Sequence, residues 1–295
     1  MSARPVTVDP TRVREILRFA RLRAKHSLSQ NFLIDTEVLD AILAAAGPEP
    51  GRRVLEVGPG LGILTGALLE AGAAVTAVEL DRGLARFVGD AFGDAIAAGA
   101  REPDAPGSLR LVQGDILDQD LAALIEPPFD VVANIPYHIT SPILHRILGL
   151  ERSPERVVLM VQREVAERVA APPGQMSYLS VFVQYHAAVT VVRTVPREAF
   201  EPAPEVESAI LLIEPHGGQP RPRSAEDEDD LWRLVQAGFR ARRKMLHNVL
   251  SRQLPLPAAR VARALEAADI SPDRRSQTLS VEEWLRLLDA IRPLP

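Results

Sequence analysis

Between residues 36 and 214, short apolar runs rich in β-branched residues alternate with stretches whose apolar residues recur every three or four positions. The short runs indicate strands and the longer stretches indicate helices. Strands that alternate with helices predict right-handed crossovers and a doubly wound, mostly parallel sheet of the α/β class. Seven runs are predicted strands: 52–57, 73–80, 109–115, 129–134, 156–161, 188–195 and 208–214.

The sequence also predicts a division into four segments. Residues 215–230 are rich in Pro, Gly and charge and have no periodicity, which is typical of a linker. Only helical patterns follow, so we expect a small all-helical domain at 231–295. The sheet domain then spans 26–214, after a basic N-terminal segment at 1–25.

Composition excludes several classes of function. The chain has no cysteine, which rules out disulfides, thiol catalysis and cysteine-bound zinc. It has no apolar run of 18 residues and no signal-peptide pattern, so we expect a cytoplasmic protein without a membrane or metal partner. With 46% hydrophobic residues, the chain can bury a substantial core.

The charge distribution is more informative than the net charge of −5. One basic group lies near the N-terminus and includes Arg21, Arg23 and Lys25; the other comprises Arg240, Arg242, Arg243 and Lys244. Acidic residues gather elsewhere, notably at 226–230. Two basic groups can neutralise nucleic-acid phosphates locally even on an acidic protein. Solvated helix faces explain such groups equally well, so charge alone leaves RNA binding open.

A glycine-rich turn follows the first predicted strand. Gly58 permits a tight turn, and Gly60 and Gly62 remove side chains where a ligand and the next helix approach the backbone. A dinucleotide fingerprint requires Gly or Ala at the sixth position, which is Ile63 here. The spacing, preceded by Glu56, therefore favours an S-adenosylmethionine pocket over a pyrophosphate site. A glycine cluster without a ligand is the alternative.

The next two predicted strands end in carboxylates. Glu79 is placed to accept the ribose hydroxyls of a nucleotide-like ligand, and Asp115 to face its adenine ring. Either acid alone is more typical of a helix N-cap. Because the carboxyl ends of parallel strands meet at one edge, the three features together predict one ligand site.

The fourth predicted strand ends in the sequence Asn-Ile-Pro-Tyr. Asn134 offers a side-chain carbonyl and Ile135 a backbone carbonyl, and Pro136 contributes no N–H. Two acceptors aimed at the hydrogens of an exocyclic amine can draw its nitrogen toward a tetrahedral, nucleophilic shape. Tyr137 supplies a flat face for an extruded base, and such stacking contributes roughly 1–3 kcal/mol. A rigid turn with a core tyrosine is the alternative.

Taken in order, several motifs resemble one family, the rRNA adenine N6-dimethyltransferases. The motifs are SQNFLID (29–35), EVGPGLG (56–62), VEL (78–80), QGDIL (113–117), NIPYHITSP (134–142) and FEPAPEVESAI (200–210). The resemblance covers about residues 25–290. The segments 239–250 and 274–284 are similar to the bacterial branch that acts on small-subunit (16S) rRNA.

The resemblance implies a Rossmann-like class I fold and S-adenosylmethionine as cofactor. Asn31 and Leu33 would close over the methionine end of the cofactor, with Gly58 under it. Asn134 would hold the reacting edge, and Phe200 would form the wall of the base slot opposite Tyr137. The implied reaction dimethylates two adjacent adenosines in a loop near the 3′ end of 16S rRNA, within an immature 30S particle, and a monomer is expected.

The chain departs from the family pattern in two places, and neither is a predicted cofactor or acceptor residue. Ser29 stands where glycine is usual, and Met176, Ser177 and Tyr178 replace a Tyr-Gly-Arg sequence, which removes one expected RNA-facing arginine. Two alternatives remain open. One is the large-subunit methyltransferase of the macrolide-resistance type, which we expect to share residues up to 214 only. The other is a non-catalytic ribosome-assembly factor.

Overall fold

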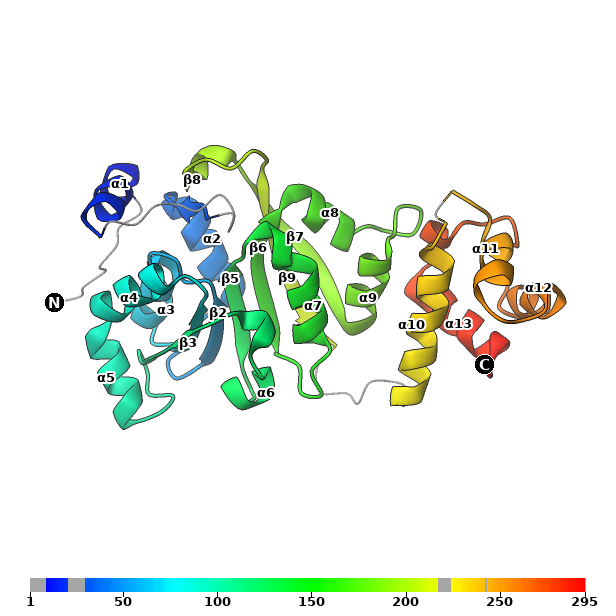
Figure 1. The fold of residues 1–295 in the computed structure, drawn as a ribbon, viewed down its shortest axis with the longest axis horizontal. Helices are drawn as coiled ribbons and strands as arrows, with labels where there is room; N and C mark the ends of the chain where they lie inside the picture. Colours follow the sequence, from blue (N-terminus) through cyan, green and yellow to red (C-terminus); the bar gives the residue numbers. More distant parts are fainter. Residues whose placement is uncertain (1–8, 21–29, 217–223, 242, 295) are drawn as a thin grey trace. The chain divides into compact units, whose positions relative to one another are not determined.

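The computed structural model describes residues 9–20, 30–216, 224–241 and 243–294. The chain forms two compact units. The first comprises Met1–Ala166 and Val189–Gly217, and the second comprises Glu167–Ala188 and Gly218–Pro295. Figure 1 shows the sheet of the first unit with helices packed around it.

All seven predicted strands occur in one sheet of the described residues, in the order β4-β3-β2-β5-β6-β9-β7. The strands are β2 (Arg53–Val57), β3 (Ala74–Glu79), β4 (Leu109–Gln113), β5 (Asp130–Asn134), β6 (Arg156–Gln162), β7 (Ala187–Val195) and β9 (Ser208–Pro215). Strands β2 to β6 pair in parallel, whereas β9 pairs antiparallel to β6. The predicted α/β class with a mostly parallel sheet is therefore confirmed.

The strand order places a crevice beside β2. From β2 the chain moves outward through β3 to β4, and it then returns to continue on the other side through β5 and β6. Ligands in open α/β sheets bind where the order reverses in this way, outside the carboxyl ends of the strands. The glycine-rich turn after β2 and the Asn-Ile-Pro-Tyr sequence after β5 flank this point.

Helices cover the central strands. Every residue of β3 is buried, as expected for a parallel strand covered on both faces. The helices of this unit are α1 (Pro10–Phe19), α2 (Thr36–Ala46), α3 (Ile63–Glu70), α4 (Arg82–Ala91), α5 (Gly93–Arg101), α6 (Leu121–Leu124), α7 (Thr140–Leu148) and the start of α8 (Arg163–Val169). A two-stranded pair, β1 (Phe32–Leu33) with β8 (Phe200–Glu201), joins two motifs distant in sequence.

The second unit is helical and has its own core. Its helices are α9 (Tyr178–His186), α10 (Ala225–Phe239), α11 (Leu246–Gln253), α12 (Ala258–Ala267) and α13 (Val281–Ile291). Trp284 is fully buried among apolar residues of these helices. No helix in the described part of the chain is long and apolar enough to cross a membrane.

Two predicted boundaries differ from the structure. Residues 225–230, predicted as linker, form the first turns of α10, which begins at a capping box between Ser224 and Asp227. Acidic residues stabilise a helix N-terminus, so the charged run is a helix start. Residues 167–188, predicted within the sheet domain, belong to the second unit because Met176, Val181 and Tyr185 pack in its core.

Candidate functional site

An open cavity of about 1160 Å³ lies at the carboxyl ends of β2, β3, β4 and β5. The residues that sequence analysis assigned to the cofactor all line it: Asn31, Leu33, Gly58, Gly60, Glu79, Asp115 and Asn134. Ile135, Pro136 and Tyr137 line it as well. The structure thus brings together residues that are up to about a hundred positions apart in the chain, and the roles predicted for them remain proposals.

The glycine-rich turn adopts backbone angles that favour glycine. Gly58 has a φ of 69°, and its N–H donates to the Val78 carbonyl at 2.9 Å, which ties the turn to β3. Gly62 has a φ of 78°, and a Cβ on it would collide with the Phe92 ring. Gly60 leaves the backbone open to the cavity and donates its N–H to the Glu79 carboxylate at 3.1 Å.

Glu79 and Glu56 bring two buried carboxyl groups to this cavity. Glu79 also accepts from the Asp81 N–H at 2.8 Å, and burial raises the pKa of its carboxyl group. Glu56 is 1% exposed and accepts from the Thr65 hydroxyl at 2.7 Å. Burial, reinforced by the neighbouring charge of Glu79, raises the pKa of Glu56 to about 8. A ligand with positive charge would stabilise the ionised form of both groups.

Asp115 combines the two roles that the sequence left open. One oxygen accepts from the Leu117 N–H at 2.8 Å and caps a short 3₁₀ helix, Ile116–Asp118. The residue also lines the cavity. A capping contact uses one carboxylate oxygen, so the cap does not exclude a ligand contact.

Asn134 is oriented by a hydrogen bond to another motif. Its side-chain N–H₂ donates to the Asn31 carbonyl at 3.2 Å, which fixes the plane of the amide. Within the described residues, no group donates to its side-chain oxygen or to the Ile135 carbonyl. Two acceptors therefore remain available at the end of β5, beside the cavity.

Tyr137 lines both this cavity and a second one. The Tyr137 hydroxyl forms a 2.8 Å hydrogen bond with the Ser208 hydroxyl, and burial raises the pKa of Tyr137. The second cavity is lined by Gln30, Asn31, Tyr137, His138, Gln162, Pro202, Ala203, Pro204, Glu205 and Val206. Because it shares Tyr137 with the first cavity, it is the candidate slot for a target base.

Phe200 differs from its predicted place. It is 2% exposed, lies in the core of the first unit, and lines neither cavity. Pairing of β8 with β1 sets Phe200 opposite Leu33 and directs it into the core. The residues that follow Phe200 line the second cavity instead, including Pro202 and Pro204.

Sequence analysis missed Gln162. This residue ends β6, the strand next to β5, and its side chain lines the second cavity. The rule that ligands bind at strand ends, applied to β2 through β5, extends to β6 and would have identified it.

The predicted RNA-binding residues are only partly described. Arg21, Arg23, Lys25 and Arg242, together with Ser29, lie outside the described residues. Arg240, Arg243 and Lys244 are exposed between α10 and α11. In the same unit, the Leu246 N–H donates to the Arg274 carbonyl at 2.7 Å, which places exposed Arg275 near this connection. We call Arg240, Arg243, Lys244 and Arg275 the basic corner.

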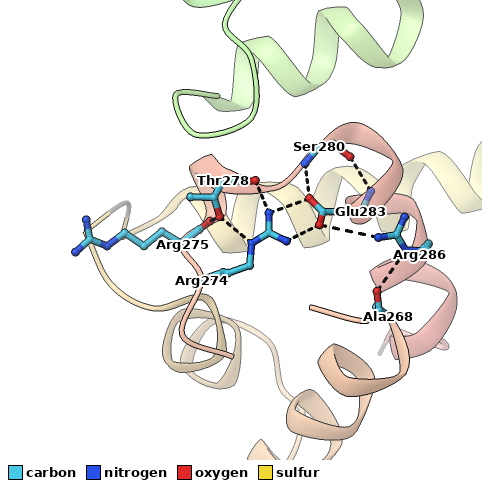
Figure 2. A network of polar contacts seen from close by, with 7 residues as sticks. All are labelled: Ala268, Arg274, Arg275, Thr278, Ser280, Glu283 and Arg286. Atoms are coloured by element: carbon cyan, nitrogen blue, oxygen red, sulfur yellow. Dashed lines mark hydrogen bonds and ion pairs between the residues drawn. The ribbon is translucent and has the colours of Figure 1, made fainter. Parts of the chain in front are cut away.

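A polar network fixes the chain beside Arg275. Figure 2 shows the Arg274 guanidinium held by Thr278 and Glu283, while the Arg275 side chain extends away from them. The Arg274 Nε donates to the Thr278 hydroxyl at 3.1 Å, and an Nη donates to Glu283 at 2.9 Å. These bonds lower the pKa of Glu283 and keep it charged. Arg274 is therefore structural, and Arg275 is the arginine presented to solvent.

The acidic run at 226–230 is largely engaged. Glu228 is 6% exposed and accepts from the Tyr185 hydroxyl at 3.3 Å, and Asp227 and Asp230 form ion pairs with Arg292. The run lies at the start of α10 and the basic corner at its end, roughly 20 Å apart at 1.5 Å per residue. The two charges of opposite sign do not neutralise each other over that distance.

Comparisons with known proteins agree with this geometry. Residues 21–292 match the family model of ribosomal RNA adenine dimethylases. A Geobacillus thermodenitrificans protein named ribosomal RNA small subunit methyltransferase A is 39% identical over 97% of this chain and 97% of its own. A protein of that name from Anaeromyxobacter sp. (strain K) is 44% identical over 90% of this chain and 93% of its own.

Two solved structures are similar to the fold. A dimethyladenosine transferase from Plasmodium falciparum has a TM-score of 0.70 and 27% identity, covering 87% of this chain and 95% of that one. The 23S rRNA methyltransferase ErmE has a TM-score of 0.66 and 28% identity, covering 88% of this chain and 99% of that one. The likeness to ErmE therefore extends beyond residue 214, farther than the sequence led us to expect.

The raised pKa of Glu56 predicts a pH-dependent stability. An unfolded glutamate ionises near pH 4.5, whereas the folded Glu56 ionises near pH 8. Stability from this group is complete below pH 4.5, falls as pH rises between these values, and levels off above pH 8. Glu56→Gln should flatten that decline, measured as the free energy of urea unfolding between pH 5 and pH 9. An unchanged slope in the variant would contradict the assignment.

Proposed function

Because the chain belongs to the ribosomal RNA adenine dimethylase family, we propose that it dimethylates the N6 amines of two adjacent adenosines near the 3′ end of small-subunit rRNA. The target is a loop of the 16S rRNA, and S-adenosylmethionine is the methyl donor. The observation that carries this proposal is the pair of available acceptors, on Asn134 and Ile135, in a cavity that shares Tyr137 with a second one.

The chemistry of the first cavity suits this cofactor. S-adenosylmethionine has a positively charged sulfur and ammonium group, a ribose diol and an adenine ring. The cavity offers buried Glu56 and Glu79 to the positive and hydroxyl groups, and Asp115 to the adenine. Gly58 and Gly60 leave room at the backbone, and Asn31 and Leu33, which also line the cavity, would close over the methionine end. When bound, the cofactor would supply an electrophilic methyl group. The sulfonium that carries it would become a neutral thioether on methyl transfer to the amine.

Asn134 and Ile135 act on the acceptor amine. The lone pair of N6 is delocalised into the purine ring, which makes it a poor nucleophile. The Asn134 side-chain oxygen and the Ile135 carbonyl accept the two N6 hydrogens and favour a tetrahedral nitrogen whose lone pair points toward the methyl group. Tyr137 supports the flat face of the base. The proton leaves to solvent, so positioning accounts for most of the rate, and this proposal requires no metal or general base.

The choice of small-subunit rRNA rests on the curated relatives. Proteins named for the small subunit are 39% and 44% identical to this chain, against 28% for ErmE. We infer that the substrate is an immature 30S particle in the cytoplasm and that the enzyme acts as a monomer. The intact Asn-Ile-Pro-Tyr sequence favours an enzyme over a non-catalytic assembly factor, although one protein can serve both purposes.

One assay tests the proposal directly. Purified protein, S-adenosylmethionine and small subunits that lack methylated adenosines are incubated, and the nuclease-digested rRNA is analysed by mass spectrometry. We expect N6-dimethyladenosine on one fragment near the 3′ end of 16S rRNA. Large subunits serve as the matched substrate, and methylation of these alone would favour the macrolide-resistance type of activity.

Substitutions should separate binding from chemistry. Asn134→Ala removes an acceptor that matters most in the transition state, so turnover should fall by about a hundredfold or more with little change in cofactor affinity. Glu79→Ala should mainly weaken cofactor binding. Single-turnover rates and isothermal titration of both variants measure the two effects, and the reverse assignment would refute these roles.

The basic corner should bind rRNA phosphates. Neutralising Arg240, Arg243 and Lys244 together should weaken subunit binding and reduce the slope of log affinity against log salt by up to about three. Cofactor binding should be unchanged, because these residues are exposed in the helical unit. A parent-like salt slope would show that this corner makes no phosphate contacts. Glu266→Gln and Asp273→Asn, on exposed positions of the same unit, control for a general change of charge.

A further inference from the structure

We propose that Gln162 holds the target adenine by a ring nitrogen in the second cavity and retains the monomethylated base for the second methyl transfer. This inference rests on the proposed function and deepens it. The base slot has several polar side chains, and their partners within the described residues decide which of them is available to a ligand.

Most of these polar groups are occupied or exposed. Gln30 and Asn31 have interaction partners, and the Tyr137 hydroxyl is bonded to Ser208. His138 and Glu205 are exposed at the rim, and a carboxylate has no hydrogen to donate. Gln162 is half-buried, and its side-chain amide makes no hydrogen bond within the described part of the chain.

Strand pairing places Gln162 beside the stacking residue. Gln162 is directly opposite Ser208 in the antiparallel pair of β6 and β9, so the two side chains lie on the same face of the sheet. The Ser208 hydroxyl in turn contacts the Tyr137 hydroxyl at 2.8 Å. The amide thus lies at the edge of the surface on which a base would stack.

Burial of a base in this slot leaves the Gln162 amide without water, so the base must provide its partner. An amide N–H₂ donates two hydrogens, and glutamine is a recurrent partner of adenine. The hydrogens on N6 are already taken by Asn134 and Ile135. The ring nitrogens that flank N6, N1 and N7, are the acceptors that remain beside the reacting amine.

The second transfer gives this contact its particular importance. Adenine has two hydrogens on N6, but N6-monomethyladenine has one. The two acceptors therefore lose one of their two hydrogen bonds after the first transfer. A ring nitrogen is unchanged by methylation of N6. A hydrogen bond from Gln162 therefore persists when the other contacts weaken, and it opposes release of the monomethylated base.

The experiment measures the ratio of N6-monomethyladenosine to N6-dimethyladenosine. Excess small subunits lacking methylated adenosines are incubated with enzyme, and digests from early time points are analysed by mass spectrometry. Gln162→Ala should raise the ratio about fivefold, the effect of one lost neutral hydrogen bond. Gln162→Glu, which keeps the shape but has no hydrogen to donate, should raise it similarly. Gln236→Ala, an exposed glutamine on α10, should leave it at the parent value.

Substrate analogues identify the nitrogen. Subunits reconstituted with 1-deazaadenosine or 7-deazaadenosine at the target positions lack N1 or N7 respectively. With the analogue that lacks the accepting nitrogen, the parent enzyme should give the raised ratio and Gln162→Ala should add nothing to it. Parent-like affinity for S-adenosylmethionine by titration shows that each variant is folded.

The outcomes separate the two proposals. No methylated adenosine from the parent protein would overturn the proposed function itself. An active parent with an unchanged ratio in both Gln162 variants, or a parent-like ratio with both deaza analogues, would overturn only the role of Gln162.

Discussion

The carboxylate of Glu79 joins the two turns from which the cofactor cavity is built. One of its oxygens accepts from the Gly60 N–H and the other from the Asp81 N–H, so the turn after β2 and the start of α4 are fixed to one side chain at the end of β3. With only 5% of its surface exposed, the carboxylate depends on these donors to offset its loss of water. A carboxylate has about four lone-pair sites, so these contacts do not exclude a ligand contact. Glu79 therefore holds the two turns of the site together and is also available to contact a ligand.

Groups of opposite charge gather in different parts of the chain. The cofactor cavity has acidic groups, and burial keeps the pKa values of Glu56 and Glu79 raised until a positive ligand arrives. A positively charged cofactor favours the ionised form of both groups, whereas a phosphate would favour their neutral form. The basic corner, in the helical unit, has exposed cations that suit phosphate. The net charge of −5 is a sum over the whole chain, so it does not reveal either of these two local environments.

Sequence analysis identified the fold and the cofactor cavity because both follow from periodicity and topology. Parallel strands bring their carboxyl ends to one edge, so Gly58, Glu79, Asp115 and Asn134 could be placed together without coordinates. Details that depend on pairing between distant segments could not be derived in this way. The pairing of β1 with β8 turned Phe200 into the core, and the pairing of β6 with β9 brought Gln162 to the second cavity.

The boundary between the sheet unit and the helical unit also depends on tertiary contacts. These contacts determine where the chain can be cut into stable fragments. Residues 167–188 lie within the catalytic segment of the sequence but belong to the helical unit, where Tyr185 contacts Glu228 and packs against Trp232. A cut at the predicted linker would leave α9 without the helices that bury its apolar face. That exposed face would destabilise the remaining fragment and favour its aggregation. The sheet unit and the helical unit are thus linked through the chain itself, since the sequence passes into the helical unit before it completes the sheet.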